Sequence, residues 1–397
     1  MKALLIISKF WPEYSGPGVR ALNTYNYLKK DMSIQLDSLC GSVIFNSNKS
    51  YLFKTTQPSI IKNHQNLKNM RIKRIACKLF PENKINFFNK IFYYLNFNIE
   101  FFLTYFYLIK NDSKKYDYFH VYGNNSITNA ALSYAKKNSI PVISEIVTPN
   151  RDFKIKQPFL FKIFQKSKFE NLKIICISNR IFNDLKKKIE TKKLIYKINP
   201  ISFKFNFKKN ILKKNFYLFN VGKFMPKKNQ IFLLKVIKIL PKNYFLTLVG
   251  PLEKKGMHAS RDKKYFLEIK RMVKYYKIQN RVNIITKFID NPKKYYHKSN
   301  LCLFPFKNEG LGTPVLESIA SGRPVFVNDE NKNFSEFYKY KTLLNIPLIP
   351  ELWAKKILSI SIHNKLLERN SKLLLSKYNS DQDNKIYKKI IKEIVKR

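Results

Sequence analysis

The feature that most constrains the fold is an alternation of short apolar runs with longer segments of helical pattern. Because these runs are apolar at successive positions, they are typical of strands that are buried on both faces of a parallel sheet. The alternation predicts an α/β protein. Ten runs are expected to be strands, in two series: Ala3–Ser8, Ile34–Leu39, Tyr118–Tyr122, Val142–Glu145 and Ile174–Ile177, then Tyr217–Val221, Phe245–Val249, Val282–Ile285, Leu301–Phe304 and Pro324–Val327.

The two series are separated by a basic, irregular stretch, "NPISFKFNFKKNILKKNFYLF". We place a domain boundary there, with one Rossmann-like domain over residues 1–203 and a second over residues 204–375. Two doubly wound domains that face each other would leave a cleft at the carboxyl ends of their strands, where open α/β sheets bind ligands. Residues 376–397 are expected to form a C-terminal helix that packs back on the first domain.

The C-terminal segment "NSDQDNKIYKKIIKEIVKR" has its own helix signals. Ser380 is expected to cap the helix, and Asp383, three residues on, lies near the positive end of the helix dipole. Ile386, Ile390 and Ile394 recur every four residues. This spacing predicts that one face of the helix docks on the rest of the chain.

The chain is strongly basic, with a formal net charge of +50 over 397 residues. One interpretation is an anionic partner, such as nucleic acid, an acidic membrane surface or a phosphorylated substrate. The other is compositional, because Lys, Asn, Ile, Phe and Tyr are all abundant together, as in proteins of AT-rich genomes. Since the lysines are spread over most predicted surfaces, the charge alone does not indicate nucleic acid. A hydrophobic content of 45% excludes a disordered basic tail.

The cysteines and the N-terminus indicate a cytoplasmic protein. Four cysteines are widely spaced and fit neither a metal site nor a redox pair: Cys40, Cys77, Cys176 and Cys302. Such spacing is typical of a reducing compartment. The first apolar run, Ala3–Ile7, is too short for the hydrophobic region of a signal peptide and fits a buried strand.

An aromatic segment, Ile85–Lys110, is the most apolar part of the chain. Lys90 and Glu100 leave charge-free runs of nine residues, which are too short to cross a bilayer. Two interpretations stay open: a core helix, and a helix that lies on a membrane interface.

The stretch "NEGLGTPVLESIASGRPVFVND" contains the signals of a short helix. Thr313 is expected at the N-cap, Pro314 at the first helical position and Gly322 just past the end. Glu317 points away from the arc that we expect to be buried. That arc comprises Val315, Leu316, Ile319 and Ala320.

The start of this helix is a candidate anion site between two glutamates. Free amides at a helix start favour phosphate oxygens, and Gly310-Leu311-Gly312 allows the backbone to approach a ligand closely. Glu309 and Glu317 would then accept hydrogen bonds from sugar or ribose hydroxyls beside the phosphate. The alternative is that Glu317 is a solvated helix residue and Glu309 only offsets the helix dipole.

This stretch resembles the Glu-x7-Glu motif of retaining nucleotide-sugar glycosyltransferases with the GT-B fold, glycosyltransferase family 4 (glycosyl transferases group 1). The resemblance continues in "VGKFMPKKNQIFLLKVIKIL", where Lys223 replaces the usual Arg, and in "LTLVGPLE". It is looser in the N-terminal half, in "SKFWPEYSGPGVRALNTYNYLKK", "YDYFHVYG", "ICISN" and "INPIS". The family implies two Rossmann-like domains facing across a cleft.

The resemblance assigns the donor site to the second domain. It implies that Lys223 and Lys228 hold the donor diphosphate and offset the charge that builds on it. Glu317 would bind the ribose and Glu309 the donor sugar. The remaining donor-site positions are Gly222, Gly310 and the backbone amides of Leu311, Gly312 and Thr313.

For the first domain the resemblance implies fewer residues. Gly16 and Gly18 would bring backbone near the diphosphate, although Pro17 departs from the family's frequent Gly-Gly. Arg20 and His120 are candidates on the acceptor side, with a surface role and a core role as their respective alternatives. Many members carry a catalytic His after the strand that reads "IPVISEIVTPN". Glu145 is the nearest polar residue here, either catalytic or a structural partner of a lysine.

The implied reaction is transfer of a sugar from a UDP- or GDP-sugar to a hydroxyl of a polysaccharide or lipid-linked acceptor of the cell envelope, with retention and without a metal or other cofactor. Asp381-Gln382-Asp383 lies in the terminal helix rather than at a strand end, which argues against a metal-held diphosphate. The basic surface and the aromatic segment would hold the protein peripherally at the anionic cytoplasmic face of the inner membrane. Two alternatives are a basic nucleic-acid-binding protein, which would concentrate its basic residues, and a GT-B-fold sugar-nucleotide epimerase.

Overall fold

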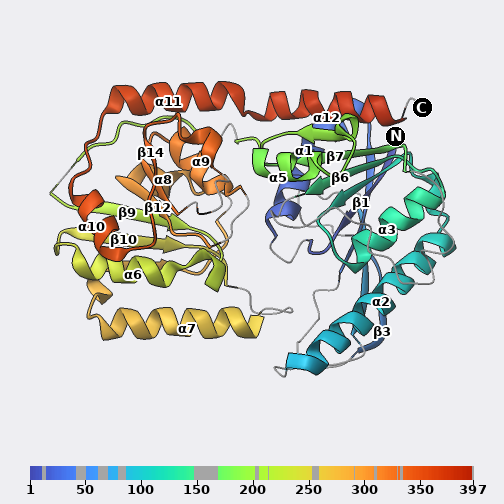
Figure 1. The fold of residues 1–397 in the computed structure, drawn as a ribbon, viewed down its shortest axis with the longest axis horizontal. Helices are drawn as coiled ribbons and strands as arrows, with labels where there is room; N and C mark the ends of the chain where they lie inside the picture. The colour runs from blue at the N-terminus through green and yellow to red at the C-terminus, as the bar shows by residue number, and fades with distance from the viewer. Residues whose placement is uncertain are drawn as a thin grey trace. The chain divides into compact units, whose positions relative to one another are not determined.

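The computed structural model describes residues 1–10, 15–41, 51–60, 70–78, 86–146, 169–201, 205–212, 214–252, 259–289, 291–307, 311–328, 330 and 334–395. They form two compact units. The N-terminal unit comprises Met1–Lys197 and Asp383–Arg397, and the C-terminal unit comprises Ile198–Lys254 and His258–Gln382. Each unit is built around one sheet of predominantly parallel strands (Figure 1).

The sheet of the N-terminal unit has the order β3-β4-β2-β1-β5-β6-β7-β8. Its strands are β1 (Lys2–Ile7), β2 (Gln35–Gly41), β3 (Tyr51–Ile60), β4 (Arg71–Lys78), β5 (Tyr118–Tyr122), β6 (Val142–Ile146), β7 (Leu172–Cys176) and β8 (Leu194–Tyr196). Only the edge pair β3 and β4 is antiparallel among these strands. Strands β2 to β4 lie on one side of β1, and strands β5 to β8 lie on the other. The point between β1 and β5 is therefore the topological switch point, where such sheets bind ligands.

The sheet of the C-terminal unit is parallel in every described pair. Its strands are β9 (Phe216–Val221), β10 (Tyr244–Val249), β11 (Val282–Ile285), β12 (Leu301–Phe304), β13 (Val325–Val327) and β14 (Leu343–Asn345). Their order is β11-β10-β9-β12-β13-β14, which is the order of dinucleotide-binding sheets. The switch point lies between β9 and β12.

Helices surround both sheets. Those of the N-terminal unit are α1 (Gly16–Met32), α2 (Asn86–Lys110), α3 (Ser126–Lys137), α5 (Asn179–Lys186) and, from Asp383 on, α12 (Ser380–Val395). Those of the C-terminal unit are α6 (Gln230–Ile239), α7 (Ala259–Tyr275), α8 (Lys293–Lys298), α9 (Thr313–Ala320), α10 (Pro350–Leu358) and α11 (Asn364–Lys377).

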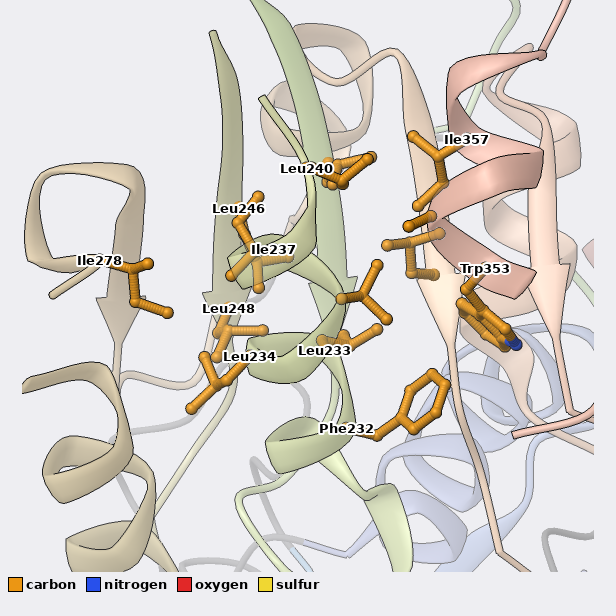
Figure 2. Close-up of a cluster of buried hydrophobic side chains, with 14 of the residues drawn as sticks. Phe232, Leu233, Leu234, Ile237, Leu240, Leu246, Leu248, Ile278, Trp353 and Ile357 are labelled. Carbon is orange, nitrogen blue, oxygen red and sulfur yellow. The ribbon is translucent and has the colours of Figure 1, made fainter. Parts of the chain in front are cut away.

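The core of the C-terminal unit lies where α6 packs on the sheet and on α10. Figure 2 shows Phe232, Leu233 and Ile237 of α6 directed toward strand residues and toward Trp353 and Ile357 of α10. The rings of Phe232 and Trp353 meet edge to face, with their centroids 5.1 Å apart. Apolar burial of this kind is the main stabilising contribution to such a unit.

The predicted fold class is confirmed, and all ten predicted strands are present with ends within two residues of those expected. Four further strands, β3, β4, β8 and β14, had no counterpart in the prediction. They lie at or next to the edges of the sheets, where the side chains of a strand are less completely covered. Such strands need not be apolar on both faces, and none of the four contains a long apolar run.

Two predictions at α9 have opposite outcomes. Thr313 is not the N-cap: Gly312 occupies that position, and no side chain caps the helix. Pro314 is therefore the second residue of the helix and not the first as predicted, although it still lies in the first turn. Gly322 follows the helix with a φ of +72°, the left-handed conformation that favours glycine, so this prediction is confirmed.

The terminal helix α12 also differs from the prediction. The amide of Gln382 donates to Oδ1 of Asn379 at 2.9 Å, so Asn379 rather than Ser380 caps the helix. Ile386 is 37% exposed and does not belong to the buried face. The residues that α12 contributes to the apolar core of the N-terminal unit are Tyr387, Ile390, Ile391 and Ile394.

The aromatic segment forms the single helix α2, which is half buried. Phe101, Tyr105 and Leu108 lie in the interior, whereas Tyr94 and Phe106 are each 61% exposed. No helix within the described residues is both long enough and apolar enough to cross a membrane.

Candidate functional site

The candidate donor site lies at the switch point of the C-terminal unit. Gly222 and Lys223 directly follow β9, and Phe306 follows β12 after a single residue. The amide of Lys307 donates to the carbonyl of Lys227 at 2.9 Å and so ties the two segments together. The carboxyl ends of these neighbouring strands therefore place the predicted lysine element beside the chain that leads to α9.

Gly250 allows the segment after β9 to pass close to the end of β10. The amide of Gly222 donates to the carbonyl of Val249 at 2.9 Å. A Cβ atom at Gly250 would lie 1.9 Å from the carbonyl oxygen of Gly222, which is closer than any real contact. Glycine is therefore required at 250 to keep the backbone of Gly222 in place.

Lys228 packs against Gly222 and against the ring of Phe306. Its aliphatic stem lies 3.5 Å from where a Cβ of Gly222 would stand. Its Nζ is 4.2 Å from the centroid of the Phe306 ring, a cation–π contact. The ring of Phe306 in turn lies 2.8 Å from where a Cβ of Gly312 would stand. The structure thus brings together Gly222, Lys228 and Gly312 through Phe306.

Lys223 is paired with a carboxylate that the sequence pattern did not reveal. Its Nζ lies 2.9 Å from Oδ2 of Asp262, which is fully buried in the first turn of α7. Arg261 donates to Oδ1 of the same carboxylate at 2.7 and 2.9 Å. Lys223 and Arg261 therefore share the one negative charge of Asp262, and a diphosphate would have to compete with Asp262 for Lys223.

The start of α9 has the features of an anion site with a carboxylate one turn away. Leu311 and Gly312 are buried, and Thr313 begins the helix. The amide of Thr313 lies at the positive end of the helix dipole. Pro314 has no N–H, and the amide of Val315 donates to the carbonyl of Gly312 at 3.0 Å, so the donors available to a ligand are those up to Thr313. Glu317 is half buried one turn on, and burial raises the pKa of its carboxyl to about 7. A phosphate at the helix start and hydroxyls at this carboxylate would fit the arrangement.

Glu317 accepts a hydrogen bond from the hydroxyl of Tyr296 on α8, with an Oη–Oε2 distance of 2.9 Å. This bond acts against burial and lowers the pKa of Glu317. The other glutamate of the motif, Glu309, lies outside the described residues, as does Gly310. Their assignments stay predictions.

In the N-terminal unit, Glu145 lies inside a buried polar network. It is fully buried on β6, and its carboxylate contacts Arg20 of α1, the hydroxyl of Tyr387 of α12, and Nε2 of His120 at 3.0 Å. Nδ1 of His120 lies 2.9 Å from the hydroxyl of Tyr25. Burial, followed by the nearby positive charge of Arg20, holds the pKa of His120 well below its ordinary value.

This network explains how two polar residues, Glu145 and His120, are tolerated on buried strands. A buried carboxylate is tolerated when hydrogen-bond donors and a cation surround it. The partner of Glu145 is thus an arginine rather than the lysine considered from the sequence. Neither Glu145 nor His120 presents its side chain to solvent, so the geometry favours a structural use of both.

Gly16 and Gly18 lie in the first turn of α1 rather than in a loop. Ser15 caps this helix, because its Oγ accepts a hydrogen bond from the amide of Gly18 at 2.9 Å. The amide of Gly18 therefore already has a partner within the cap. Arg20, two residues on, is 9% exposed, and its guanidinium stacks over Tyr122 at 5.2 Å.

A second buried ion pair involves Asp383, the second aspartate of the Asp-x-Asp string in the C-terminal helix. Asp383 contacts Lys197, and both side chains are buried in the N-terminal unit. Nζ of Lys197 also lies 4.6 Å from the ring centroid of Tyr387. The described residues contain no cluster of three or more His, Cys, Asp or Glu side chains that could hold a metal ion.

Three residues beside the donor site were not recognised from the sequence: Asp262, Tyr296 and Arg323. Arg323 is fully buried, and its N–H groups donate to carbonyls of three segments: Tyr296 and His297 of α8, Lys208 and Lys209 before β9, and Gly322. Its position directly after Gly322 in "SGRPVF" was the one available signal, since charged residues are rarely buried without such partners.

Residues 202–372 match the family model of "Glycosyl transferases group 1". The chain is also 32% identical over 199 residues to the capsular polysaccharide biosynthesis glycosyltransferase CapH of Staphylococcus aureus. That match covers 47% of this chain and 51% of the relative, so it spans about half the length of the relative. The family match falls within the C-terminal unit and includes every described residue of the candidate donor site.

Solved structures resemble the whole chain. A glycosyltransferase from Rickettsia africae has a TM-score of 0.68 at 14% identity, covering 100% of this chain and 99% of that one. Anabaena Alr3699/HepE in complex with UDP-glucose has a TM-score of 0.67 at 11% identity, covering 100% of both chains. At these identities the likeness defines the fold. The chain therefore has the GT-B fold of glycosyltransferases, and its residues 202–372 match the glycosyl transferases group 1 family.

Proposed function

We propose that the chain is a glycosyltransferase that takes a sugar from a UDP- or GDP-sugar. The observation that carries the proposal is the convergence of Gly222, Lys228 and Gly312 at the switch point of a unit that matches the group 1 family. Glu317 lies one turn into α9, the helix that begins after Gly312. CapH, which is related over about half its length, is named for capsular polysaccharide biosynthesis. This supports a polysaccharide or lipid-linked acceptor of the cell envelope.

In the proposed reaction an acceptor hydroxyl forms a bond to the anomeric carbon of the donor sugar. The bond from that carbon to the β-phosphate oxygen breaks, and its electron pair stays on the phosphate. The hydroxyl proton moves to the same phosphate oxygen, on the face that the leaving group occupied, so the configuration is retained. Positive groups at the diphosphate lower the barrier because negative charge develops there.

The residues divide this work. Lys228 and the amides of Gly312 and Thr313 would hold the diphosphate. Glu317 would accept hydrogen bonds from the ribose. Lys223 would contribute when it exchanges Asp262 for phosphate, and Glu309 would contact the donor sugar. On the acceptor side, Arg20 would be the contact residue. Glu145 and His120 would act through Arg20 by holding its guanidinium.

We propose that the positive charge of these groups makes a metal ion unnecessary. Lys228 would supply a positive charge to the diphosphate, and the backbone amides at the start of α9 would donate hydrogen bonds to it. Turnover should persist in a chelator such as EDTA. Loss of activity in EDTA that returns with Mg²⁺ or Mn²⁺ would contradict the metal-free mechanism.

We further propose that α2 rests on an anionic membrane from the cytoplasmic side. Its exposed face carries Ile91, Tyr94, Leu95, Phe106 and Ile109, each at least 37% exposed. A row of aromatic and aliphatic side chains on a chain of net charge +50 suits the boundary between anionic headgroups and acyl chains. In a flotation assay, Phe106→Ser should weaken binding to vesicles containing phosphatidylglycerol. The control Tyr275→Ser, at a residue 78% exposed in the C-terminal unit, should not.

The donor assignment is tested by calorimetric titration with UDP and GDP, followed by a panel of sugar nucleotides scored for hydrolysis and transfer. Wild type should bind one of the two nucleotides, and Glu317→Ala should weaken that binding while the protein stays folded. An unchanged affinity in the variant would contradict the proposal. Conversion of one sugar nucleotide into its epimer would favour the epimerase, and salt-sensitive RNA binding without nucleotide binding would favour a nucleic-acid-binding protein.

A further inference from the structure

The ring of Tyr296 is fixed behind Glu317 by aromatic packing. It is fully buried and meets Phe219 and Phe205 edge to face, with centroids 5.0 and 5.5 Å away. The backbone of the same turn is also held, because Arg323 donates to the carbonyls of Tyr296 at 2.8 Å and His297 at 3.1 Å. The hydroxyl of Tyr296 consequently has little freedom to move.

The hydroxyl of Tyr296 donates a hydrogen bond to one carboxylate oxygen of Glu317, Oε2, and makes none to the other, Oε1. Its single proton is donated to Oε2, while the carbonyl of Pro314 lies farther away, at 3.4 Å. No described residue donates to Oε1 of Glu317. A carboxylate fixed at one oxygen presents the second oxygen in a constant direction, which is what recognition of a ligand hydroxyl requires.

We propose that Tyr296 is a positioning residue for donor binding, which orients Glu317 so that Oε1 accepts from the ribose hydroxyls. This inference rests on the proposed function, since it assigns Glu317 to the nucleotide. It adds a residue on a different helix, outside the Glu-x7-Glu motif. Tyr296 touches no ligand itself and acts only through the glutamate.

The groups around Glu317 leave it as the one that titrates near neutrality. Burial raises the pKa of Tyr296 and raises the pKa of Cys302, on β12, to about 11. Arg323 stays charged, although burial lowers its pKa to about 10. Burial also lowers the pKa of His297, whose Nε2 lies 3.0 Å from the carbonyl oxygen of Asn206. Burial also raises the pKa of Glu336 to about 7, so the difference between the pH profiles of a variant and wild type is what reports on Glu317.

The experiment compares Tyr296→Phe with wild type by calorimetric titration of UDP or GDP, whichever binds, between about pH 6 and about pH 9. Removing the donor should raise the pKa of Glu317, so the midpoint of the binding profile should move up by about one pH unit. The loss of affinity should then be about tenfold near pH 7 and smaller near pH 9. The phosphate of the nucleotide titrates equally with both proteins, so the difference belongs to the protein.

Matched controls separate positioning from general damage. Tyr340→Phe removes the hydroxyl of another buried tyrosine of the same unit, one with no hydrogen-bond partner among the described residues, and should leave the profile unchanged. Replacement of Tyr296 by 3-fluorotyrosine keeps the ring and strengthens the donor. It should move the midpoint down, which tests the inference even if Tyr296→Phe folds poorly.

The outcomes are distinguishable. A wild-type midpoint in both Tyr296 variants would overturn the inference and leave the proposed function standing, provided that Glu317→Gln weakens binding. If Glu317→Gln binds the nucleotide as wild type does, the proposed function fails and the role of Tyr296 fails with it.

Discussion

Glu317→Gln is expected to stabilise the C-terminal unit at alkaline pH while it weakens nucleotide binding. Burial raises the pKa of Glu317 from 4.5 to about 7, so the folded state resists ionisation of this carboxyl. Between these two values the folded state binds more protons than the unfolded state, and stability falls as the pH rises. Glutamine keeps an oxygen for the hydroxyl of Tyr296 but carries no charge to bury.

The size of the effect follows from the pKa difference. Raising a pKa from 4.5 to about 7 corresponds to about 3 kcal/mol, and partial solvent access to this half-buried residue reduces it to about 2 kcal/mol. The penalty is absent below about pH 4.5 and complete above about pH 7. Glu336 also has a pKa raised to about 7 by burial, so only the difference between variant and wild type isolates Glu317.

The assay uses one of the two tryptophans as a local probe. A Trp11→Phe background leaves only Trp353, which is buried in the core of the C-terminal unit. Urea unfolding followed by its fluorescence should show equal stability of the two proteins near pH 4.5 and a gain of about 2 kcal/mol for Glu317→Gln near pH 8.5. The exposed control Glu268→Gln should show no gain. A variant that is no more stable than wild type at high pH would refute the reasoning.

Three further variants test other parts of the structure. Lys228→Met should weaken UDP or GDP binding by tenfold or more, about 1.4 kcal/mol, whereas Lys238→Met, which removes a cation–π lysine on α6, should leave calorimetric affinity intact. Gly250→Ala forces a carbonyl to move and should cost about 3 kcal/mol of stability in the same urea assay; an unperturbed midpoint would contradict the close approach. Lys197→Met leaves Asp383 buried without its cation and should destabilise the N-terminal unit by about 3 kcal/mol by calorimetry, and Asp383→Asn in the same chain should restore most of it.

The strands that cross the middle of each sheet could be predicted from the sequence because both of their faces are buried. Runs such as "LCLFPF" have no polar position to obscure them. Strand β4, which lies next to the edge strand β3, has Lys73 and Arg74 between the buried Ile72 and Ile75, so it lacked that signal. The end of α9 was also predictable, since Gly322 needs a positive φ, but its start was not, because no side chain caps it.

Residues of the candidate site could be predicted only where they belong to a contiguous sequence motif. Gly222, Lys228, Gly312 and Glu317 stand in contiguous motifs, whereas Tyr296 reaches Glu317 from another helix, 21 residues away in sequence. Asp262 likewise pairs with Lys223, although the two residues are 39 positions apart in sequence. Such pairings depend on how α7 and α8 pack on the sheet, and no spacing rule along the chain reports this.

In the N-terminal unit, the sequence could not show whether the polar residues on the strands bind a ligand or other residues of the protein. Glu145 and His120 stand in strands that are apolar on both sides, and their partners come from the first and last helices of the chain. A single strand cannot show whether its polar residue faces a ligand or an internal arginine. The burial of Glu145 by Arg20, His120 and Tyr387 became evident only from the folded unit.

The central claim is that a nucleoside diphosphate binds at the switch point between β9 and β12. Hydrogen–deuterium exchange of the full chain with and without saturating UDP or GDP tests it most directly, because it locates the ligand. We predict slower exchange in peptides that cover Gly222–Lys228 and the first turn of α9, and loss of that protection in Lys228→Met. Protection confined to other segments, or none at saturation, would contradict the account.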